Sequence, residues 1–172
     1  AYLAKNPQFH LKPDTPLIPP PAGTKDRGRL VADPKAKCWR LMPDGKAPAS
    51  DWKTAGFNDK GWEPIALPST QVGSKNVRML RGTFDLEDPA VVQAMSLEYA
   101  TSGRLQVHLN GSLVMDINPS GGRGSTGGAE ILLKPSTRKL LRPGTNHLAV
   151  AVAHPPGNTE LKLALKMTTK GQ

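Results

Sequence analysis

The segment Gly122–Gly127 carries glycines in the order G-x-G-x-x-G, with Arg123 after the first of them. This spacing is the dinucleotide-binding fingerprint, in which backbone N–H groups at a helix N-terminus bind a pyrophosphate. Here Pro135 ends the segment before a convincing helix, and Arg142 stands about twenty positions on, where the fingerprint requires an acidic residue. We therefore interpret the segment as a mobile loop, whose Arg123 and backbone N–H groups could bind an anionic ligand.

Five side chains form the candidate ligand-binding set: Trp52, Arg104, Asp116, Asn118 and Arg123. An arginine pairs with a carboxylate or sulfate through parallel hydrogen bonds, while aspartate and asparagine bind hydroxyl groups. An exposed tryptophan offers a flat apolar face on which a sugar ring can stack. The competing interpretation of the tryptophans, at positions 39, 52 and 62, is burial with the indole N–H hydrogen-bonded.

The sequence contains no arrangement typical of catalysis or of a metal centre. No serine stands in a G-x-S-x-G turn, and the single cysteine, Cys38, has no evident partner base, so we interpret it as a buried, inert thiol. The histidines lack metal-ligand spacing, and we interpret all four as structural: His10, His108, His147 and His154. Glu98 and Asp116 could in principle form a carboxylate pair for glycoside hydrolysis, but we expect both on exposed strand faces. Some β-sandwich sugar binders hold calcium, yet no run of carboxylates supports a calcium site here, and we expect no cofactor.

The charge balance favours anionic partners. The chain has 172 residues, with 23 Lys and Arg against 14 Asp and Glu, and a formal net charge of +9. Such a charge suits an acidic polysaccharide or an anionic cell surface, and its alternative interpretation is general solubility. The basic residues are spread along the chain, which argues against nucleic acid as a partner. No apolar stretch approaches the roughly twenty residues of a membrane span.

Turn signals divide the chain into a proline-rich start and a strand-rich remainder. Residues 1–30 are dense in proline, and we expect an extended linker or surface strap, with recognition by an aromatic groove as the alternative. We expect residues 31–172 to form the globular domain. Within it we expect an irregular segment at 51–62, a Gly/Ser-rich loop at 118–128, and strands that include 38–42, 77–86, 94–100, 105–109, 147–154 and 160–167. Roughly eight strands without helical crossovers predict an all-β fold, an antiparallel β-sandwich.

The dipeptide Asn110-Gly111 predicts the tightest turn of this sandwich. Asn-Gly tolerates positive φ at both central positions of a type I′ turn, which makes it the preferred two-residue hairpin. Before the turn, alternate apolar residues from Leu105 to Leu109 share one face, and we expect His108 on the opposite face, toward solvent or the sheet surface. After the turn, we expect Leu113 and Met115 to continue the apolar face.

Four blocks of the chain resemble, in order, the motifs of galactose-binding-like jelly rolls, which occur in bacterial β-galactosidases, rhamnosidases and other secreted hydrolases. They are Trp52 with Gly-Phe-Asn-Asp-Lys-Gly-Trp62, Arg81-Gly-Thr-Phe84, the hairpin from Arg104 to Val114, and the strand from Leu141 to Val152. The resemblance implies a jelly-roll fold with Trp39 and Trp62 in or beside the core, and Trp52 as the tryptophan best placed for exposure. The chain departs from the pattern at Asn58, where the family has an aspartate, and at Thr101-Ser102, where an acidic pair is common.

Such domains bind sugars in some proteins and only brace a catalytic neighbour in others. We therefore expect a non-catalytic carbohydrate-binding or accessory module, part of a larger secreted or periplasmic bacterial protein that processes polysaccharides. Its ligand is expected to be a glycan, with some preference for an anionic one. The alternative is a module that packs on a partner protein or a catalytic domain and binds no sugar itself.

Overall fold

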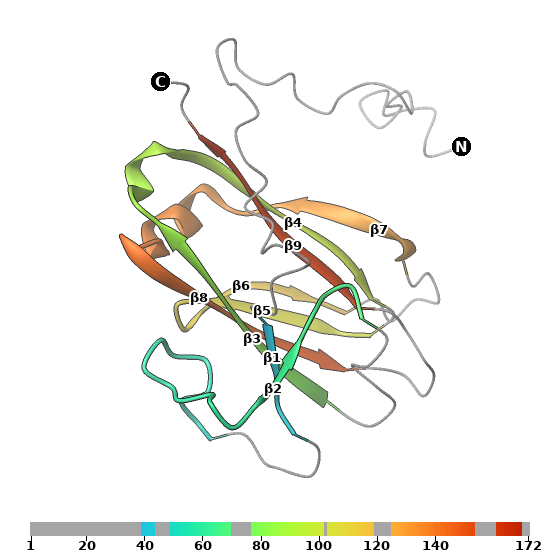
Figure 1. The fold of residues 1–172 in the computed structure, drawn as a ribbon. Coiled ribbons are helices and arrows are strands. Elements are labelled where there is room, and N and C mark those ends of the chain that lie inside the picture. Colours follow the sequence, from blue (N-terminus) through green and yellow to red (C-terminus); the bar gives the residue numbers. More distant parts are fainter. Residues whose placement is uncertain are drawn as a thin grey trace, which may run out of the picture.

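Two antiparallel sheets packed face to face make up the computed structural model, which describes residues 39–43, 49–69, 77–101, 103–118, 125–153 and 161–169. The larger sheet has six strands in the order β2-β1-β3-β8-β5-β6, and the smaller has three in the order β7-β4-β9 (Figure 1). The strands are β1 (Trp39–Leu41), β2 (Glu63–Ile65), β3 (Val77–Leu86), β4 (Val92–Thr101), β5 (Leu105–Leu109), β6 (Ser112–Ile117), β7 (Ser125–Leu132), β8 (Gly144–Ala153) and β9 (Lys162–Thr169). Two short 3-10 helices, η3 (Pro89–Val91) and η4 (Pro135–Leu140), follow β3 and β7. The prediction of an all-β antiparallel sandwich is confirmed.

Some of the sequence-based expectations fall outside the described residues. These are the extended segment 1–30, Cys38, Arg123, His10 and His154.

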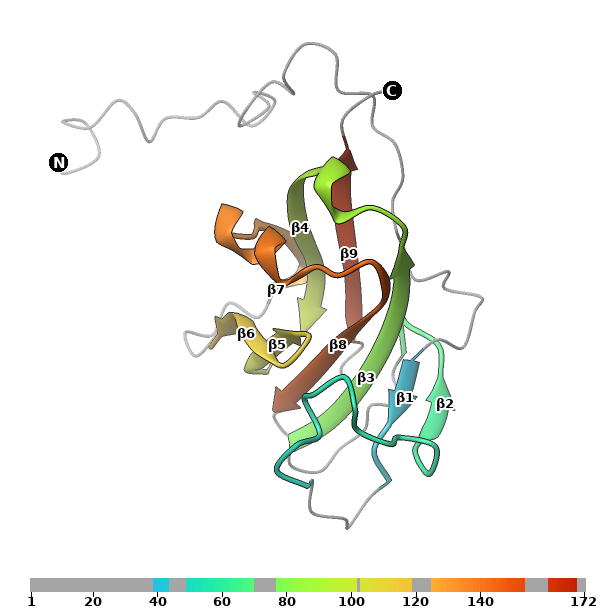
Figure 2. The same ribbon diagram turned by 90° about the vertical axis from the view of Figure 1, so that its left-hand side faces the viewer.

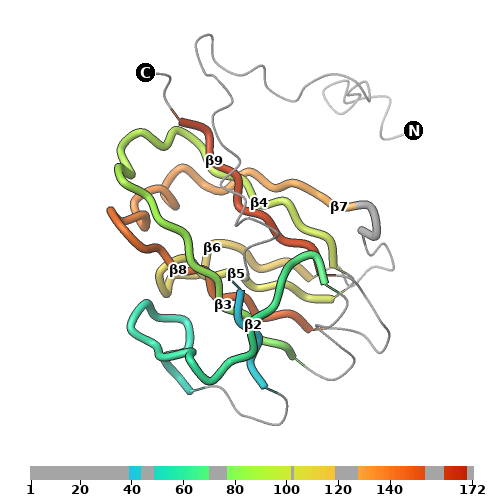
Figure 3. The backbone as a smooth tube through the Cα atoms, viewed as in Figure 1, coloured from blue at the N-terminus to red at the C-terminus, as the bar shows by residue number. Residues whose placement is uncertain are grey.

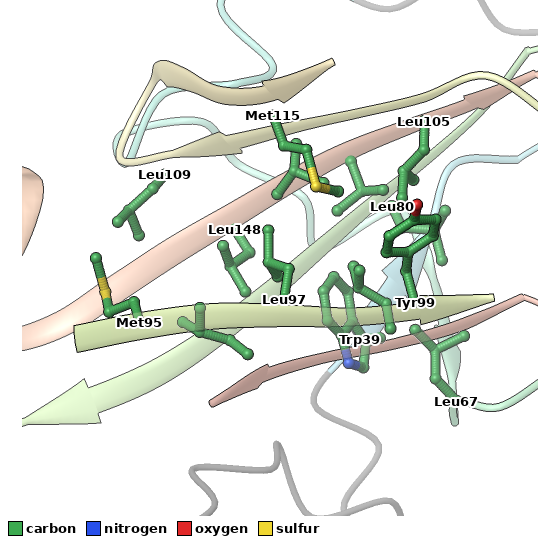
Figure 4. Packing of buried hydrophobic residues seen from close by; sticks show 14 of the residues in the cluster. Trp39, Leu67, Leu80, Met95, Leu97, Tyr99, Leu105, Leu109, Met115 and Leu148 are labelled. Atoms are coloured by element: carbon green, nitrogen blue, oxygen red, sulfur yellow. The ribbon is translucent and has the colours of Figure 1, made fainter. Parts of the chain in front are cut away.

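Alternate residues from both sheets fill the space between them. Figure 4 shows Leu80 of β3, Leu97 and Tyr99 of β4 and Leu105 of β5 gathered around Trp39 of β1, and all five are buried. The alternating apolar residues near the C-terminal end also belong to this core: Leu161, Leu163, Leu165 and Met167. The period of two in a strand places these side chains on one face of their sheet.

β8 is a central strand that is buried on both of its faces. Val150 and Val152 point into the space between the sheets, whereas Ala149 and Ala151 belong to a second apolar cluster. The sequence from Leu148 to Val152 is apolar at consecutive positions, so apolar residues occupy both faces of the strand, as is typical of a strand buried on both sides. The second cluster lies on the outer side of the larger sheet.

Residues 49–62, here called the cover segment, close that outer side. Figures 1 and 3 show this segment in teal, on the opposite side of the larger sheet from β4 and β9. Its aromatic residues Trp52, Phe57 and Trp62 pack with Ala149 and Ala151 of β8. Trp52 and Trp62 stack with their ring centroids 6.4 Å apart.

Two expectations about exposure are corrected by the cover segment. Trp52 retains only 4% of its accessible surface, so it is not an exposed stacking platform. His108 does point away from the sandwich core, but it is 6% exposed because Trp52 lies against it with ring centroids 6.2 Å apart. Trp39 and Trp62 are buried as expected. The cover segment has no regular period, and the sequence pattern therefore did not show which face it covers.

A buried arginine of β3 holds the cover segment in place. Arg81 is 1% exposed, and its Nη1 donates hydrogen bonds to the carbonyl oxygens of Trp52 and Thr54. Its Nε donates to Asp59 Oδ2 at 3.0 Å, and its guanidinium lies 5.3 Å from the ring centroid of Phe57. The charge-assisted hydrogen bonds satisfy a buried cation that would otherwise be costly.

The predicted Asn-Gly hairpin is present, with one irregularity. Asn110 has φ 49° and Gly111 has φ 92°, the positive values that a type I′ turn requires. A bulge then shifts the register, because Val107 pairs with Met115 while His108 pairs with Leu113. Met115 reaches the core as expected, but Leu113 is 53% exposed, which corrects the expectation that it continues the apolar face. Leu113 pairs with His108 and therefore shares its outer face, whereas the extra residue of the bulge turns Met115 to the core face.

Two asparagines tie the hairpin turn to the start of β8. Asn146 is fully buried; its Nδ2 donates to the carbonyls of Arg142 and Gly144, and its Oδ1 accepts from Asn110 Nδ2 at 2.8 Å and from the backbone N–H of Arg142. Asn110 Nδ2 also donates to the carbonyl of Leu140, at the end of η4. This asparagine network satisfies backbone groups between η4 and the start of β8 and ties that connection to the β5–β6 turn.

The loop expected at 118–128 is shorter than the sequence suggested. Residues from Ser125 onward belong to β7, which pairs with β4 from Thr101↔Ser125 to Ser96↔Leu132. Glycine and serine are poor strand formers in isolation, but an existing neighbour strand supplies the backbone hydrogen bonds that such a segment needs.

Candidate functional site

Arg104, Gln106 and Asp116 form a polar cluster on the β5–β6 hairpin, at the edge of the larger sheet. Figure 2 shows this hairpin at one edge and the pair β1 and β2 at the other. Gln106 and Asp116 are direct neighbours across the two strands. Arg104 precedes β5 by one residue, which places it beside the end of β6. The cluster therefore lies at the far end of the hairpin from the Asn110-Gly111 turn.

Hydrogen bonds fix the geometry of the polar cluster. Arg104 donates from Nε to Asp116 Oδ1 at 2.9 Å and from Nη2 to Oδ2 at 2.7 Å, a bidentate pair. Gln106 Nε2 donates to Asp116 Oδ2 at 2.9 Å. The hydrogen bonds from Arg104, and to a smaller extent the one from Gln106, lower the pKa of Asp116 to about 2. Asp116 in turn raises the pKa of Arg104.

The polar cluster is open to solvent. The side chains of Arg104 and Asp116 are 51% and 31% exposed. Asn118 stands two residues beyond Asp116, just after β6, and is also exposed. Three of the five predicted site residues, Arg104, Asp116 and Asn118, therefore lie at one end of the hairpin. Trp52 is buried elsewhere, and Arg123 lies outside the described residues.

Gln106 belongs to the polar cluster but was not among the expected site residues. A regular two-residue hairpin would pair Gln106 with Met115, and only the bulge brings it opposite Asp116. The alternation of polar residues in β5 was a weak signal for Gln106, because it placed this residue on the outer face with His108.

Glu98 and Asp116 do not form the carboxylate pair that was considered for glycoside hydrolysis. Glu98 lies on β4 in the smaller sheet, where it forms ion pairs with Lys162 and Lys166 of β9, whereas Asp116 lies on β6 in the larger sheet. Hydrogen bonds from Lys162 and Lys166 lower the pKa of Glu98 to about 2. Both groups are thus ionised at neutral pH, and neither is suited to act as a general acid.

Within the described residues, no group of three or more His, Cys, Asp or Glu side chains could hold a metal ion. In the same part of the chain, no helix has the length and apolar character needed to cross a membrane.

Comparison with protein-family models finds no match to this chain, and comparison with curated proteins finds none. Solved structures do match. A glycosyl hydrolase family 2 member from Bacteroides cellulosilyticus has a TM-score of 0.57 at 17% identity, over 76% of this chain and 20% of that chain. A beta-glycosidase from Bacteroides vulgatus has a TM-score of 0.57 at 12% identity, over 76% and 19% of the two chains. Bacteroides uniformis beta-glucuronidase has a TM-score of 0.53 at 17% identity, over 74% and 17%.

These similarities concern the fold and one part of each enzyme. The chain spans about a fifth of the length of the glycosidases that it matches. Identities of this size carry no residue-by-residue conclusion about a site. At the level of the fold, the expected resemblance to bacterial glycosidases is confirmed: the chain is a β-sandwich similar to one part of each of these enzymes.

Proposed function

We propose that this chain is a non-catalytic accessory module of a secreted or periplasmic polysaccharide-processing protein, and that it binds a glycan through the polar cluster and Asn118. The observation that carries the proposal is the exposed bidentate pair of Arg104 and Asp116 with Gln106 bonded to the same carboxylate. Hydrogen bonds between these planar groups fix their positions, which reduces the entropy cost of binding.

The unused hydrogen-bonding groups of the polar cluster suit a sugar. Arg104 uses Nε and Nη2 on Asp116, which leaves Nη1 for a ligand carboxylate, sulfate or hydroxyl. The ionised Asp116 accepts hydrogen bonds from hydroxyl groups, and the amide of Asn118 both donates and accepts. The net charge of +9 supports a preference for an anionic glycan.

Affinity electrophoresis tests this proposal, with acidic and neutral polysaccharides cast separately in the gel. We expect wild-type protein to be retarded by at least one acidic polysaccharide, and Arg104→Gln to lose most of that retardation. Lys166→Gln is the matched control, since it removes one positive charge from the ion pairs with Glu98 and Glu130 on the other sheet. Equal losses of retardation in both variants would show that net charge, and not the polar cluster, causes the retardation. An absence of retardation on every glycan would refute the proposal.

Packing against a catalytic neighbour is the second candidate. Burial of Trp52 removes the expected sugar-stacking face. Leu113 and Leu132 lie on edge strands and are 53% and 62% exposed. Exposed leucines at sheet edges are suited to a protein contact. Co-purification of a partner at low ionic strength, without retardation by any glycan and abolished by Leu132→Asp, would select this function over sugar binding.

A further inference from the structure

The cover segment lies over two histidines that the proposed function does not use. His108 of β5 and His147 of β8 both lie on the outer face of the larger sheet. The hydrogen bonds between described backbone groups of the cover segment are local, as in Trp52 N–H to Ala49 and Trp62 N–H to Asp59. Side-chain contacts therefore carry much of its attachment to the sheet, chiefly through Arg81.

His147 accepts a hydrogen bond that its neutral form alone can accept. Its Nδ1 lies 3.3 Å from Arg81 Nη2, and a guanidinium nitrogen can only donate. Protonation of Nδ1 would place two donors and two positive charges against each other. The other charged groups that act on His147 are Asp59, from the cover segment, and Arg142, from the turn before β8.

His108 is enclosed without a partner for one ring nitrogen. Its Nδ1 is buried and has no hydrogen-bond partner, while a backbone hydrogen bond joins the ring to Ala149. Trp52 of the cover segment covers the imidazole edge-on. Of the charged groups that act on it, Lys53 of the cover segment opposes protonation, and Asp116 of β6 favours it. A proton on Nδ1 would leave a buried cationic donor unsatisfied.

We propose that the cover segment is an acid-sensitive lid, which separates from the outer face of the larger sheet when His108 and His147 are protonated, while the sandwich between the two sheets stays folded. Separation brings water to both imidazoles and removes Lys53 and Trp52 from His108. The core between the sheets contains neither histidine, because both side chains lie on its other side. Local opening of a surface segment below the free energy of global unfolding is common in proteins.

The direction of the pH effect follows from burial. Burial is the largest cause that lowers the pKa of both histidines below the ordinary 6.5, and Lys53 for His108 and Arg81 for His147 lower it further. The open state therefore binds more protons than the closed state. The closed lid is fully stabilised above pH 6.5 and loses stability as the pH falls below it.

Hydrogen exchange measures this opening at single amides. Between pH 7.5 and 5.0, and after correction for intrinsic exchange, we expect the opening constant reported by Trp52, Thr54 and Trp62 to rise, by at most about 30-fold for each histidine. Amides of β8 that face β3 should keep their protection. An equal rise in β8 would indicate global unfolding and overturn the proposal, as would an unchanged cover segment.

Variants separate the two histidines from other acid effects. His147→Asn keeps an acceptor oxygen for Arg81, and His108→Gln keeps an amide donor for Ala149, so the double variant should remain closed at pH 5.0. A variant with His10→Gln and His154→Gln is the matched control and should open like the wild type. Persistence of the full pH effect in the double variant would refute the assignment, and if it does not fold, each single variant should lose part of the effect. No glycan enters these measurements, and their outcome is independent of the proposed sugar site.

Discussion

Gly82→Ala is expected to destabilise the sandwich by forcing Trp39 out of its present position. Gly82 of β3 lies directly opposite Trp39 of β1 in the sheet. A Cβ added to Gly82 would lie 2.8 to 2.9 Å from three atoms of the indole ring, whereas ordinary contact begins at 3.4 Å. The ring is 3% exposed and enclosed by the core, so it cannot turn away freely.

The expected cost combines two opposing effects. The indole must retreat by about half an ångström in a core packed at crystal-like density, which costs about 1–3 kcal/mol. Alanine offsets about 0.5–1 kcal/mol of this, because glycine loses more conformational freedom on forming a strand. We therefore expect a net loss of about 1–2 kcal/mol in the free energy of unfolding.

Urea unfolding followed by tryptophan fluorescence measures this loss. With a slope of about 2 kcal/mol per molar urea, the midpoint should fall by about 0.5–1 M. Gly61→Ala is the matched control, since a Cβ there meets nothing within 4 Å. The control should be neutral or stabilised by up to about 1 kcal/mol. Equal midpoints for the two variants would refute the argument that the contact between Gly82 and Trp39 limits the packing of β1 on β3.

Three further outcomes test other parts of the structure. Arg81→Met should lower the free energy of unfolding, measured in urea, by about 3 kcal/mol, because it leaves Asp59 and two carbonyls without their buried partner. Arg40→Met removes the more exposed partner of Asp59 and should lower it by under about 1 kcal/mol. Asn110→Ala should melt below Asn110→Gly in calorimetry, by a temperature equivalent to about 1 kcal/mol, since both lose the same hydrogen bonds but only alanine is strained at φ 49°. Glu98→Gln should weaken the acid dependence of stability below pH 4.5. The lysine contacts that hold the pKa of Glu98 at about 2 stabilise the fold above pH 4.5, and this stabilisation is lost as the pH falls toward 2. An unchanged dependence in the variant would contradict the ion-pair assignment.

The strands could be predicted from the sequence because alternation and turn chemistry are local signals. The run from Val77 to Leu86 matches β3, and the Asn110-Gly111 turn has the backbone that its two residues require. The apolar run around Val150 correctly indicated a strand that is buried on both faces. In each case the evidence lies within about ten consecutive residues.

The site was predicted less completely because its parts depend on tertiary contacts. Trp52 is covered by a sheet face that its own segment does not specify, and Arg81 is buried although arginine is usually exposed. Gln106 joins Asp116 only because of a bulge in β6. Arg104, Asp116 and Asn118 do lie at one end of the hairpin, and their binding of a ligand stays a prediction.

The asparagine network implies that the connections at the two ends of the sandwich differ in how much their lengths can vary. At the end formed by Asn110, Leu140 and Asn146, each connection has a length that brings particular amide groups into register. A residue inserted there would break several hydrogen bonds at once and leave buried groups unsatisfied. Arg104 and Asn118, at the other end of the hairpin, take no part in this network. We therefore expect natural variation in loop length, and with it any change of ligand, to accumulate at that end.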